Sequence, residues 1–121
     1  MERIKTTSTN YLNKQAIYEE CNEMYAISLI GGQWTLGILS TLITGRMRFG
    51  EIRNTIPQIT ERMLTLELRK LEQNKIITRT VYAEVPPRVE YELTPIGYKL
   101  RSIIQELDSW GKDYKDNICN L

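Results

Sequence analysis

The spacing of apolar residues predicts helices in the first third of the chain. A weak helical pattern over residues 11–19 indicates a first short helix. A second helix follows Cys21 and ends at Gly31-Gly32, because paired glycines break helices. Residues 34–44 are apolar nearly all round, which is typical of a central helix that is buried on most sides.

Two more helices follow, separated by a short interruption. Phe49, Ile52 and Ile56 share one face of a brief helix, and Pro57 ends it because proline has no amide donor and disfavours helix in the preceding residue. Thr60 is a candidate N-cap for a helix that runs to about residue 73. Its buried stripe has helical spacing and consists of Leu64, Leu68 and Leu71. A short helix, a turn and a longer helix form the helix-turn-helix pattern.

The apolar spacing then changes to the alternation expected of strands. Residues 76–85 are rich in β-branched and aromatic residues, and residues 88–93 alternate between apolar and charged side chains. Pro86-Pro87 lies between these runs, so the hairpin turn must be wider than a two-residue turn. We expect a two-stranded wing after the helix-turn-helix.

A long amphipathic helix is predicted over residues 95–118, with Thr94 as N-cap and Pro95 in the first turn. Its apolar stripe contains Ile96, Leu100, Ile103, Ile104, Leu107, Trp110, Tyr114 and Ile118. The stripe is longer than so small a core needs. We therefore expect Ile103, Leu107, Trp110 and Tyr114 to form a dimer interface, the alternative being a helix that only covers its own core.

Together these elements predict a mostly helical α+β protein, a winged helix-turn-helix with additional N- and C-terminal dimerisation helices. The length of 121 residues favours a single domain over residues 1–121. Within it we expect a flexible tail over 1–10, the helix-turn-helix and wing over 46–93, and the dimerisation helix over 95–118.

Composition narrows the function. The chain has no histidine and two cysteines, which excludes histidine-based catalysis, histidine metal ligands and cysteine-rich zinc sites. We expect no enzyme, metal or cofactor. No apolar run approaches the roughly 20 residues that span a bilayer, and the first residues lack the apolar core of a secretory signal. These features favour a cytoplasmic protein without a membrane partner.

The formal net charge of +1 is unevenly distributed. Residues 45–88 contain nine basic and five acidic residues, a net charge of +4, while the remainder contains seven basic and ten acidic residues, a net charge of −3. A basic middle segment is typical of a nucleic-acid-binding module. An ordinary solvated surface can have the same pattern, so charge alone leaves both interpretations open.

The outer face of the helix after Thr60 is the candidate interface with double-stranded DNA. With the leucines inward, this face presents Arg62, Thr65, Leu66 and Arg69. Arginine can bond guanine through two hydrogen bonds, and threonine or leucine methyl groups can contact the thymine methyl. We expect Thr60 to contact DNA at the start of this helix. Arg48, before the motif, and Arg88, at the base of the wing, are the expected phosphate contacts.

Two other functions are open alternatives to DNA binding. A winged helix recruited for protein–protein contact is favoured by Glu84, Glu90 and Glu92 on the hairpin, because carboxylates repel phosphate. Catalysis by paired carboxylates is the third, but the sequence gives no sign of a pocket around them. Binding to duplex DNA that falls steeply with salt distinguishes the first function from the others.

Several segments occur in order across residues 20–112: Gly31-Gly32-Gln33-Trp34, Arg48-Phe49-Gly50-Glu51-Ile52, Ile56-Pro57-Gln58-Ile59-Thr60, Leu64-Thr65 with Leu68-Arg69-Lys70-Leu71-Glu72, Val85-Pro86-Pro87-Arg88-Val89-Glu90-Tyr91, Leu93-Thr94-Pro95-Ile96-Gly97 and Trp110-Gly111. In this order and spacing they resemble the HxlR-type bacterial transcriptional regulators, a MarR-like family. The resemblance implies a homodimer built from N- and C-terminal helices. It also implies binding to a pseudo-palindromic operator, with one recognition helix in each half-site. The sequence does not identify a small-molecule effector.

Cys21 lies where many members of that family carry a cysteine that senses oxidants or electrophiles, so the resemblance makes it a redox-sensing candidate. The residues themselves point both ways. A helix that starts after Cys21 favours the thiolate, whereas Glu19, Glu20 and Glu23 favour the neutral thiol. A buried packing role is the alternative. Cys119 is a candidate resolving partner.

Overall fold

The computed structural model describes residues 20–119. By its contacts the chain divides into two compact units, Met1–Gln33 and Trp34–Leu121, and each is described by itself. The expected tail over 1–10 and the first helix over 11–19 lie outside the described residues. The expectation of one domain over residues 1–121 stays a prediction.

In the first unit, helix α2 (Asn22–Ile30) begins directly after Cys21, which is its extended N-cap. The helix ends at Gly31, whose N–H donates to the Ile27 carbonyl at 2.7 Å. A Cβ at position 31 would lie 2.6 Å from that same carbonyl oxygen, so only glycine fits this close approach. The predicted helix between Cys21 and the paired glycines is confirmed.

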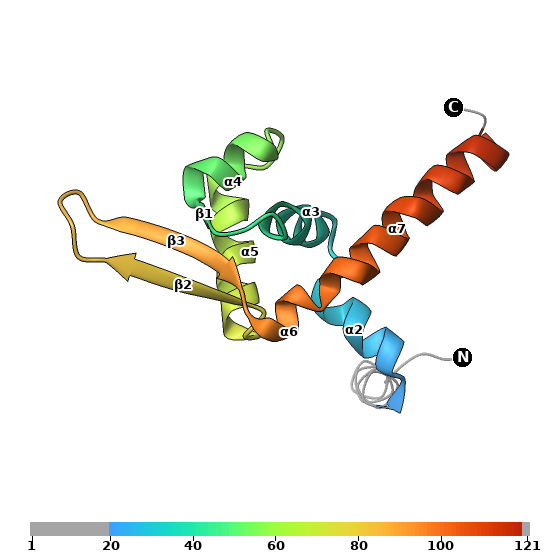
Figure 1. The fold of residues 1–121 in the computed structure, drawn as a ribbon, viewed down its shortest axis with the longest axis horizontal. Helices are drawn as coiled ribbons and strands as arrows, with labels where there is room; N and C mark the ends of the chain where they lie inside the picture. Colours follow the sequence, from blue (N-terminus) through green and yellow to red (C-terminus); the bar gives the residue numbers. More distant parts are fainter. Residues whose placement is uncertain (1–19, 120–121) are drawn as a thin grey trace, which may run out of the picture. The chain divides into compact units, whose positions relative to one another are not determined.

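Helix α3 (Gln33–Leu42) forms the centre of the second unit. Ile38, Leu39 and Leu42 are completely buried, while Trp34 is half-buried. The helix ends two residues before the predicted end at residue 44. Gly45 follows with φ +138°, in the left-handed region that favours glycine, and turns the chain into the next element. Figure 1 shows α3 packed among the helices of the helix-turn-helix, with the hairpin extending from them.

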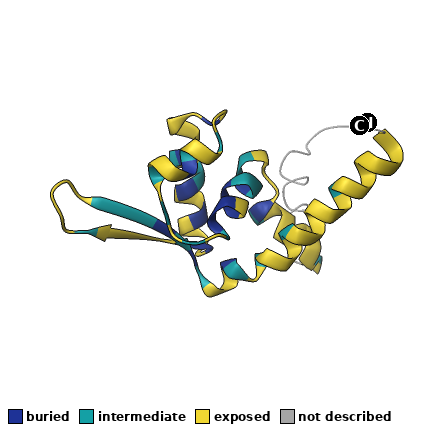
Figure 2. Cartoon of the chain, turned by 45° about the horizontal axis from the view of Figure 1, so that its top comes forward, coloured by how far each residue is buried: buried dark blue, intermediate teal, exposed yellow. Residues whose placement is uncertain are grey.

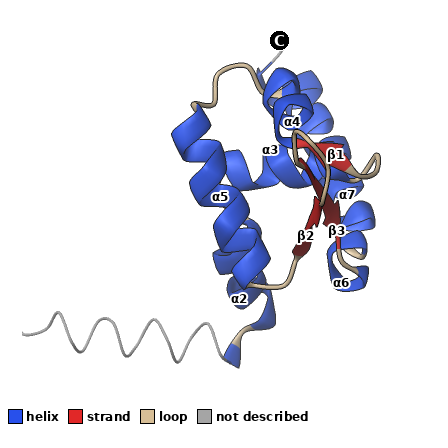
Figure 3. Cartoon of the chain, turned by 90° about the vertical axis from the view of Figure 1, so that its left-hand side faces the viewer, coloured by secondary structure: helices blue, strands red, loops and turns tan. Residues whose placement is uncertain are grey.

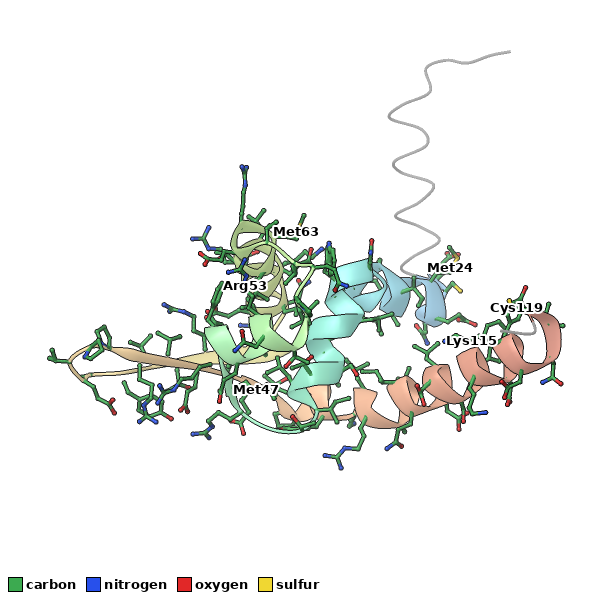
Figure 4. The ribbon with its side chains drawn as sticks, turned by 90° about the horizontal axis from the view of Figure 1, so that it is seen from above. Met24, Met47, Arg53, Met63, Lys115 and Cys119 are labelled. Carbon is green, nitrogen blue, oxygen red and sulfur yellow. The ribbon has the colours of Figure 1, made fainter. Side chains whose placement is uncertain are left out.

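Helices α4 (Phe49–Thr55) and α5 (Glu61–Gln73) form the predicted helix-turn-helix. The Thr60 hydroxyl accepts a hydrogen bond from the Met63 N–H at 3.1 Å, which confirms Thr60 as the N-cap of α5. Arg53 of α4 donates to the Glu61 carboxylate at 2.9 Å and joins the two helices across the turn (Figure 4). The stripe Leu64, Leu68 and Leu71 is buried, as predicted.

The three strands β1 (Met47–Arg48), β2 (Ile77–Tyr82) and β3 (Arg88–Leu93) form one antiparallel sheet in the order β1-β3-β2 (Figure 3). The pair Ile77 and Leu93 is buried at the base of the hairpin. Farther out, Val81 pairs with Val89 and is 53% exposed. The core therefore holds the base of the wing, and the outer half is left to solvent.

The C-terminal segment is helical in three parts: α6 (Pro95–Tyr98), α7 (Leu100–Tyr114) and the π-helical η1 (Lys115–Cys119). One helix over 95–118 was predicted. Lys99, which separates α6 from α7, keeps helical backbone angles, so the run is nearly continuous. No residue of α7 is buried, and Figure 2 shows it almost entirely in the colour of exposed residues.

The structure is mostly helical with a small three-stranded antiparallel sheet, which confirms the predicted winged helix-turn-helix. Among the described helices, none has the length and the apolar character needed to cross a bilayer.

Candidate nucleic-acid interface

The outer face of α5, defined here as Arg62, Thr65, Leu66 and Arg69, lies opposite the buried leucine stripe. Arg62 and Arg69 are exposed, and Leu66 is 47% exposed. The Thr65 hydroxyl donates to the Glu61 carbonyl at 2.8 Å, which leaves its methyl group as the outward apolar contact. The structure therefore brings together the four side chains that the sequence placed on this face.

Thr60 is the N-cap of α5, directly before the outer face of that helix. Its hydroxyl oxygen is used by the Met63 N–H, so it holds the first turn of α5. Thr60 is exposed, and a contact with DNA at this position stays a prediction.

Ion pairs separate the basic residues into two groups. Arg53 pairs with Glu61 at 2.9 Å, and Lys70 pairs with Glu67 at 3.7 Å. Among the described residues, no ion pair involves Arg48, Arg62, Arg69 or Arg79. Cations without a carboxylate partner thus occur on the outer face of α5, just before α4 and on β2. These positions can bind anions without first breaking an internal ion pair.

Arg88 does not lie at the base of the wing, and that part of the prediction is wrong. It begins β3, pairs in register with Tyr82 and follows the hairpin turn, so it lies at the outer end of the sheet. Its guanidinium bonds Glu84 and Glu90 at 3.0 Å each and lies 3.9 Å from the centre of the Tyr82 ring. Two carboxylates already neutralise this cation. Contact with phosphate stays a prediction.

Arg46 is a wing residue that sequence patterning did not single out. It reaches across β3, with its guanidinium 2.9 Å from the Tyr82 hydroxyl, 3.5 Å from Glu90 and 3.3 Å from Glu92. The Glu92 carboxylate, with a smaller contribution from Tyr82, raises the pKa of Arg46. The contact depends on the pairing of β1 with β3, which no local signal reveals.

These contacts also bear on the three glutamates of the hairpin, which in the sequence favoured a protein-docking surface. Glu84, Glu90 and Glu92 each form an ion pair with Arg46 or Arg88. The carboxylates are therefore largely neutralised within the wing. Their presence on the hairpin no longer favours a protein-docking surface over DNA binding.

Arg79 was also not singled out from the sequence. It pairs with Tyr91 in the sheet and faces α5, where it lines a cleft of about 360 Å³. The cleft is lined by Thr65, Leu68, Arg69, Glu72, Arg79 and Tyr91. Alternation along β2 could have found this residue, because it places Arg79 on the same face as Ile77 and Val81.

Cys21 lies at the N-terminus of α2 and is half-buried. Its thiol donates to the Glu23 carboxylate at 3.1 Å. The pKa of Glu23 is lowered by a backbone hydrogen bond and, secondly, by this thiol, so a charged carboxylate faces the sulfur. Cys119, at the end of η1, is exposed, and both cysteines are free.

The predicted interface residues of the C-terminal helix, Ile103, Leu107, Trp110 and Tyr114, are all exposed. Trp110 and Tyr114 stack with their ring centres 5.4 Å apart. Trp110 is 66% exposed in this arrangement. An apolar stripe this exposed suits burial against another surface. Within residues 20–119, no three metal-ligating side chains of His, Cys, Asp or Glu gather into a site.

Comparison with known proteins identifies the family. The model of the HxlR-like helix-turn-helix family matches residues 29–119. The chain belongs to this family. Its HxlR-like segment includes the helix-turn-helix, the wing and the whole C-terminal helical run.

Similar proteins are transcriptional regulators, which confirms that functional class. YdeP of Bacillus subtilis strain 168, an uncharacterised HTH-type transcriptional regulator, is 46% identical over 104 residues, covering 86% of this chain and 81% of YdeP. The redox regulator HypR in its oxidised form has a TM-score of 0.72 and 43% identity, covering 77% of this chain and 96% of HypR. Diamide-treated YodB from B. subtilis has a TM-score of 0.66 and 41% identity, covering 78% of this chain and 94% of YodB.

Proposed function

We propose that this HxlR-like chain regulates transcription by binding an operator in double-stranded DNA as a homodimer. The observation that carries the proposal is the outer face of α5, where two exposed arginines without ion-pair partners among the described residues flank an exposed leucine. A protein helix of this kind fits the major groove, where arginine and methyl groups can read base edges.

Each side chain has a role in this proposal. Arg62 and Arg69 hydrogen-bond base edges, while Leu66 and the Thr65 methyl group contact thymine methyl groups. Arg48 is exposed just before α4 and binds a backbone phosphate, which positions the motif. Thr60 caps α5 and thereby fixes where the helix begins.

The homodimer rests on α7. Its exposed stripe of Ile103, Leu107, Trp110 and Tyr114 offers the same surface on two copies, as a two-fold interface requires. Two-fold symmetry would place the two copies of α5 about 34 Å apart, which matches successive major grooves on one side of the duplex.

The test is a binding titration with a duplex selected from a random-sequence library by the wild-type protein. Arg62→Ala and Arg69→Ala are expected to weaken binding by about 1–3 kcal/mol each and to relax the preference at one base position. Lys115→Gln, in η1 and far from the wing (Figure 4), is the control that removes one positive charge elsewhere. If both arginine variants bind the selected duplex like wild type, α5 is not the reading helix.

The protein-docking alternative predicts a different result. A winged helix that only binds proteins would select no duplex sequence, and any residual binding would not differ between wild type and the α5 variants. A regulator that binds DNA should instead lose affinity steeply with salt, because phosphate contacts release counterions.

We also propose that Cys21 is the oxidant-sensitive residue. HypR is described as a redox regulator, and YodB has been treated with diamide. Cys21 is half-buried at a helix N-terminus, where access and the helix dipole allow thiol chemistry. Diamide accepts two electrons and two protons as two thiols join in a disulfide, with Cys119 of the same chain or of the second subunit as the expected partner.

The redox proposal is tested by DNA binding before and after diamide in wild type, Cys21→Ser and Cys119→Ser. Loss of binding in wild type, but not in Cys21→Ser, is expected. Retained sensitivity in Cys119→Ser would assign the second thiol to another molecule. Equal loss in wild type and Cys21→Ser, or no loss in either, would make Cys21 a packing residue.

A further inference from the structure

The cleft between α5 and β2 contains two cations and one anion. Arg69 comes from the outer face of α5, Arg79 comes from β2, and Glu72 lies one helical turn beyond Arg69. Among the described residues, no ion pair uses either arginine or Glu72. The cleft therefore has a net charge of +1 and an arginine on each of its two walls.

Most other basic side chains of the helix-turn-helix and the wing form ion pairs within the chain. Arg46, Arg53, Lys70 and Arg88 all bond carboxylates of the same unit. Arg79 is exposed, and its strand partner Tyr91, which lines the same cleft, is buried. An exposed guanidinium without an ion-pair partner among the described residues is available to an anion from outside the chain.

The position of Arg79 indicates which anion this is. An α-helix with its side chains is about 10–12 Å wide, and the major groove is about 12 Å wide. A strand that packs against the side of a helix in the groove must therefore lie over the wall of the groove, which is the sugar-phosphate backbone. β2 contacts α5, and Arg79 of β2 lines one cleft together with Thr65 and Arg69 of α5.

We propose that Arg79 binds the DNA phosphate next to the base that Arg69 contacts, with the phosphate seated in the α5–β2 cleft. This inference rests on the proposed DNA-binding function and adds a positioning residue to it. The phosphate contact fixes how far α5 enters the groove, while Arg69, on the opposite wall, reads the base. Glu72 weakens the site, since its carboxylate repels the same phosphate.

The experiment measures Kd against salt concentration for the selected duplex and for a random duplex of equal length. Arg79→Gln is expected to weaken binding to both duplexes by the same factor, on the order of tenfold, and to lower the salt slope by about one. Arg79→Lys should restore the slope because it restores the charge. Glu72→Gln should bind both duplexes a few-fold more tightly. Lys115→Gln should behave like wild type.

Three outcomes would overturn the proposal. An unchanged salt slope in Arg79→Gln, with a normal melting curve, would mean that no phosphate is bound there. Weaker binding to the selected duplex alone would make Arg79 a base contact. Unchanged or weaker binding by Glu72→Gln would place the phosphate outside the cleft. None of these results tests whether α5 reads the base sequence, which Arg62→Ala and Arg69→Ala test separately. A wild-type protein that binds no duplex would overturn both the proposed DNA-binding function and the phosphate contact of Arg79.

Discussion

Thr35 of α3 donates a hydrogen bond of 2.7 Å to the Glu67 carboxylate of α5. Thr35 is 1% exposed and the Glu67 side chain is 16% exposed, so water cannot easily replace either partner. The second oxygen of Glu67 lies 3.7 Å from the Lys70 ammonium. This polar contact joins the central helix to the helix proposed to read DNA, and it adds to the buried leucine stripe that orients α5.

Thr35→Val is expected to lower the free energy of unfolding by about 1–3 kcal/mol, because it keeps the shape of the side chain but leaves a mostly buried carboxylate without its donor. Urea denaturation followed by circular dichroism measures this loss. Thr55→Val is the matched control, since that hydroxyl donates to the Glu51 carbonyl on an exposed surface. Equal losses in the two variants would contradict a special role for the Thr35–Glu67 contact.

Gly97 is a second position where packing leaves little freedom. It lies in α6, and a Cβ there would overlap the Ile76 carbonyl oxygen and press on Leu93 at 3.2 Å. Gly97→Ala is therefore expected to destabilise the chain by about 1–3 kcal/mol through overpacking. Gly50→Ala, where a Cβ meets nothing within 4 Å, should be neutral or slightly stabilising. Thermal melts of both variants make the comparison, and similar melting temperatures would contradict it.

Elements with local signals were predictable from the sequence. The bounds of α5 follow from the Thr60 cap and the leucine stripe, both of which lie within the helix or next to it. The hairpin strands follow from alternation in the same way. The break at Lys99 had no signal, because its backbone remains helical and only the hydrogen-bond pattern changes.

Contacts between distant segments were not predictable. Arg46 reaches Glu92 because β1 pairs with β3. For Arg79, alternation gives the face of β2, but only the fold shows that this face lies against α5. A strand of two residues gives too short a pattern to be recognised as a strand. The placement of Arg88 was wrong for a different reason. The predicted strand already began at Arg88, directly after the turn, and the first residue after a hairpin turn lies at the outer end of the wing and not at its base.

Arg88 is expected to support the wing through its contacts with Glu84, Glu90 and Tyr82. Arg88→Ala removes two ion pairs and the stacking on Tyr82, a loss of about 1–2 kcal/mol for partly exposed groups. Limited proteolysis should then cut within residues 83–87 faster than in wild type. Arg48→Ala, with no ion pair among the described residues, should leave this cleavage rate unchanged. If Arg88→Ala lowers the salt slope for DNA binding without faster cleavage, Arg88 contacts phosphate and does not support the wing.

Leu107→Glu is expected to separate the proposed dimer without unfolding the monomer. Leu107 is exposed in the described chain, so a charge there costs little in the monomer but would be buried between two copies of α7. Sedimentation at micromolar concentration should show a monomer with a wild-type melting profile. Gln105→Glu adds the same charge at another exposed position of α7 and should remain dimeric. A monomeric wild-type protein would rule out the interface.

The last prediction concerns the carboxylate beside Cys21. The thiol donates to Glu23 at 3.1 Å, and a backbone hydrogen bond together with this thiol lowers the pKa of Glu23, which favours the charged carboxylate. A negative charge at this distance opposes the negative sulfur that attacks an electrophile. Because Glu23 is exposed to solvent, water screens this repulsion, and removing the charge should change the rate only a few-fold.

Glu23→Gln should therefore react with iodoacetamide a few-fold faster than wild type, measured by mass spectrometry in a Cys119→Ser background. The difference should shrink in 1 M salt, where the screening length falls to about 3 Å. Glu20→Gln is the matched control, because Glu20 is exposed and Glu23 is the carboxylate that accepts the thiol proton. Equal acceleration in both variants would show that Cys21 responds only to the general charge of the segment. No acceleration in Glu23→Gln would mean that the thiol leaves this contact before it reacts.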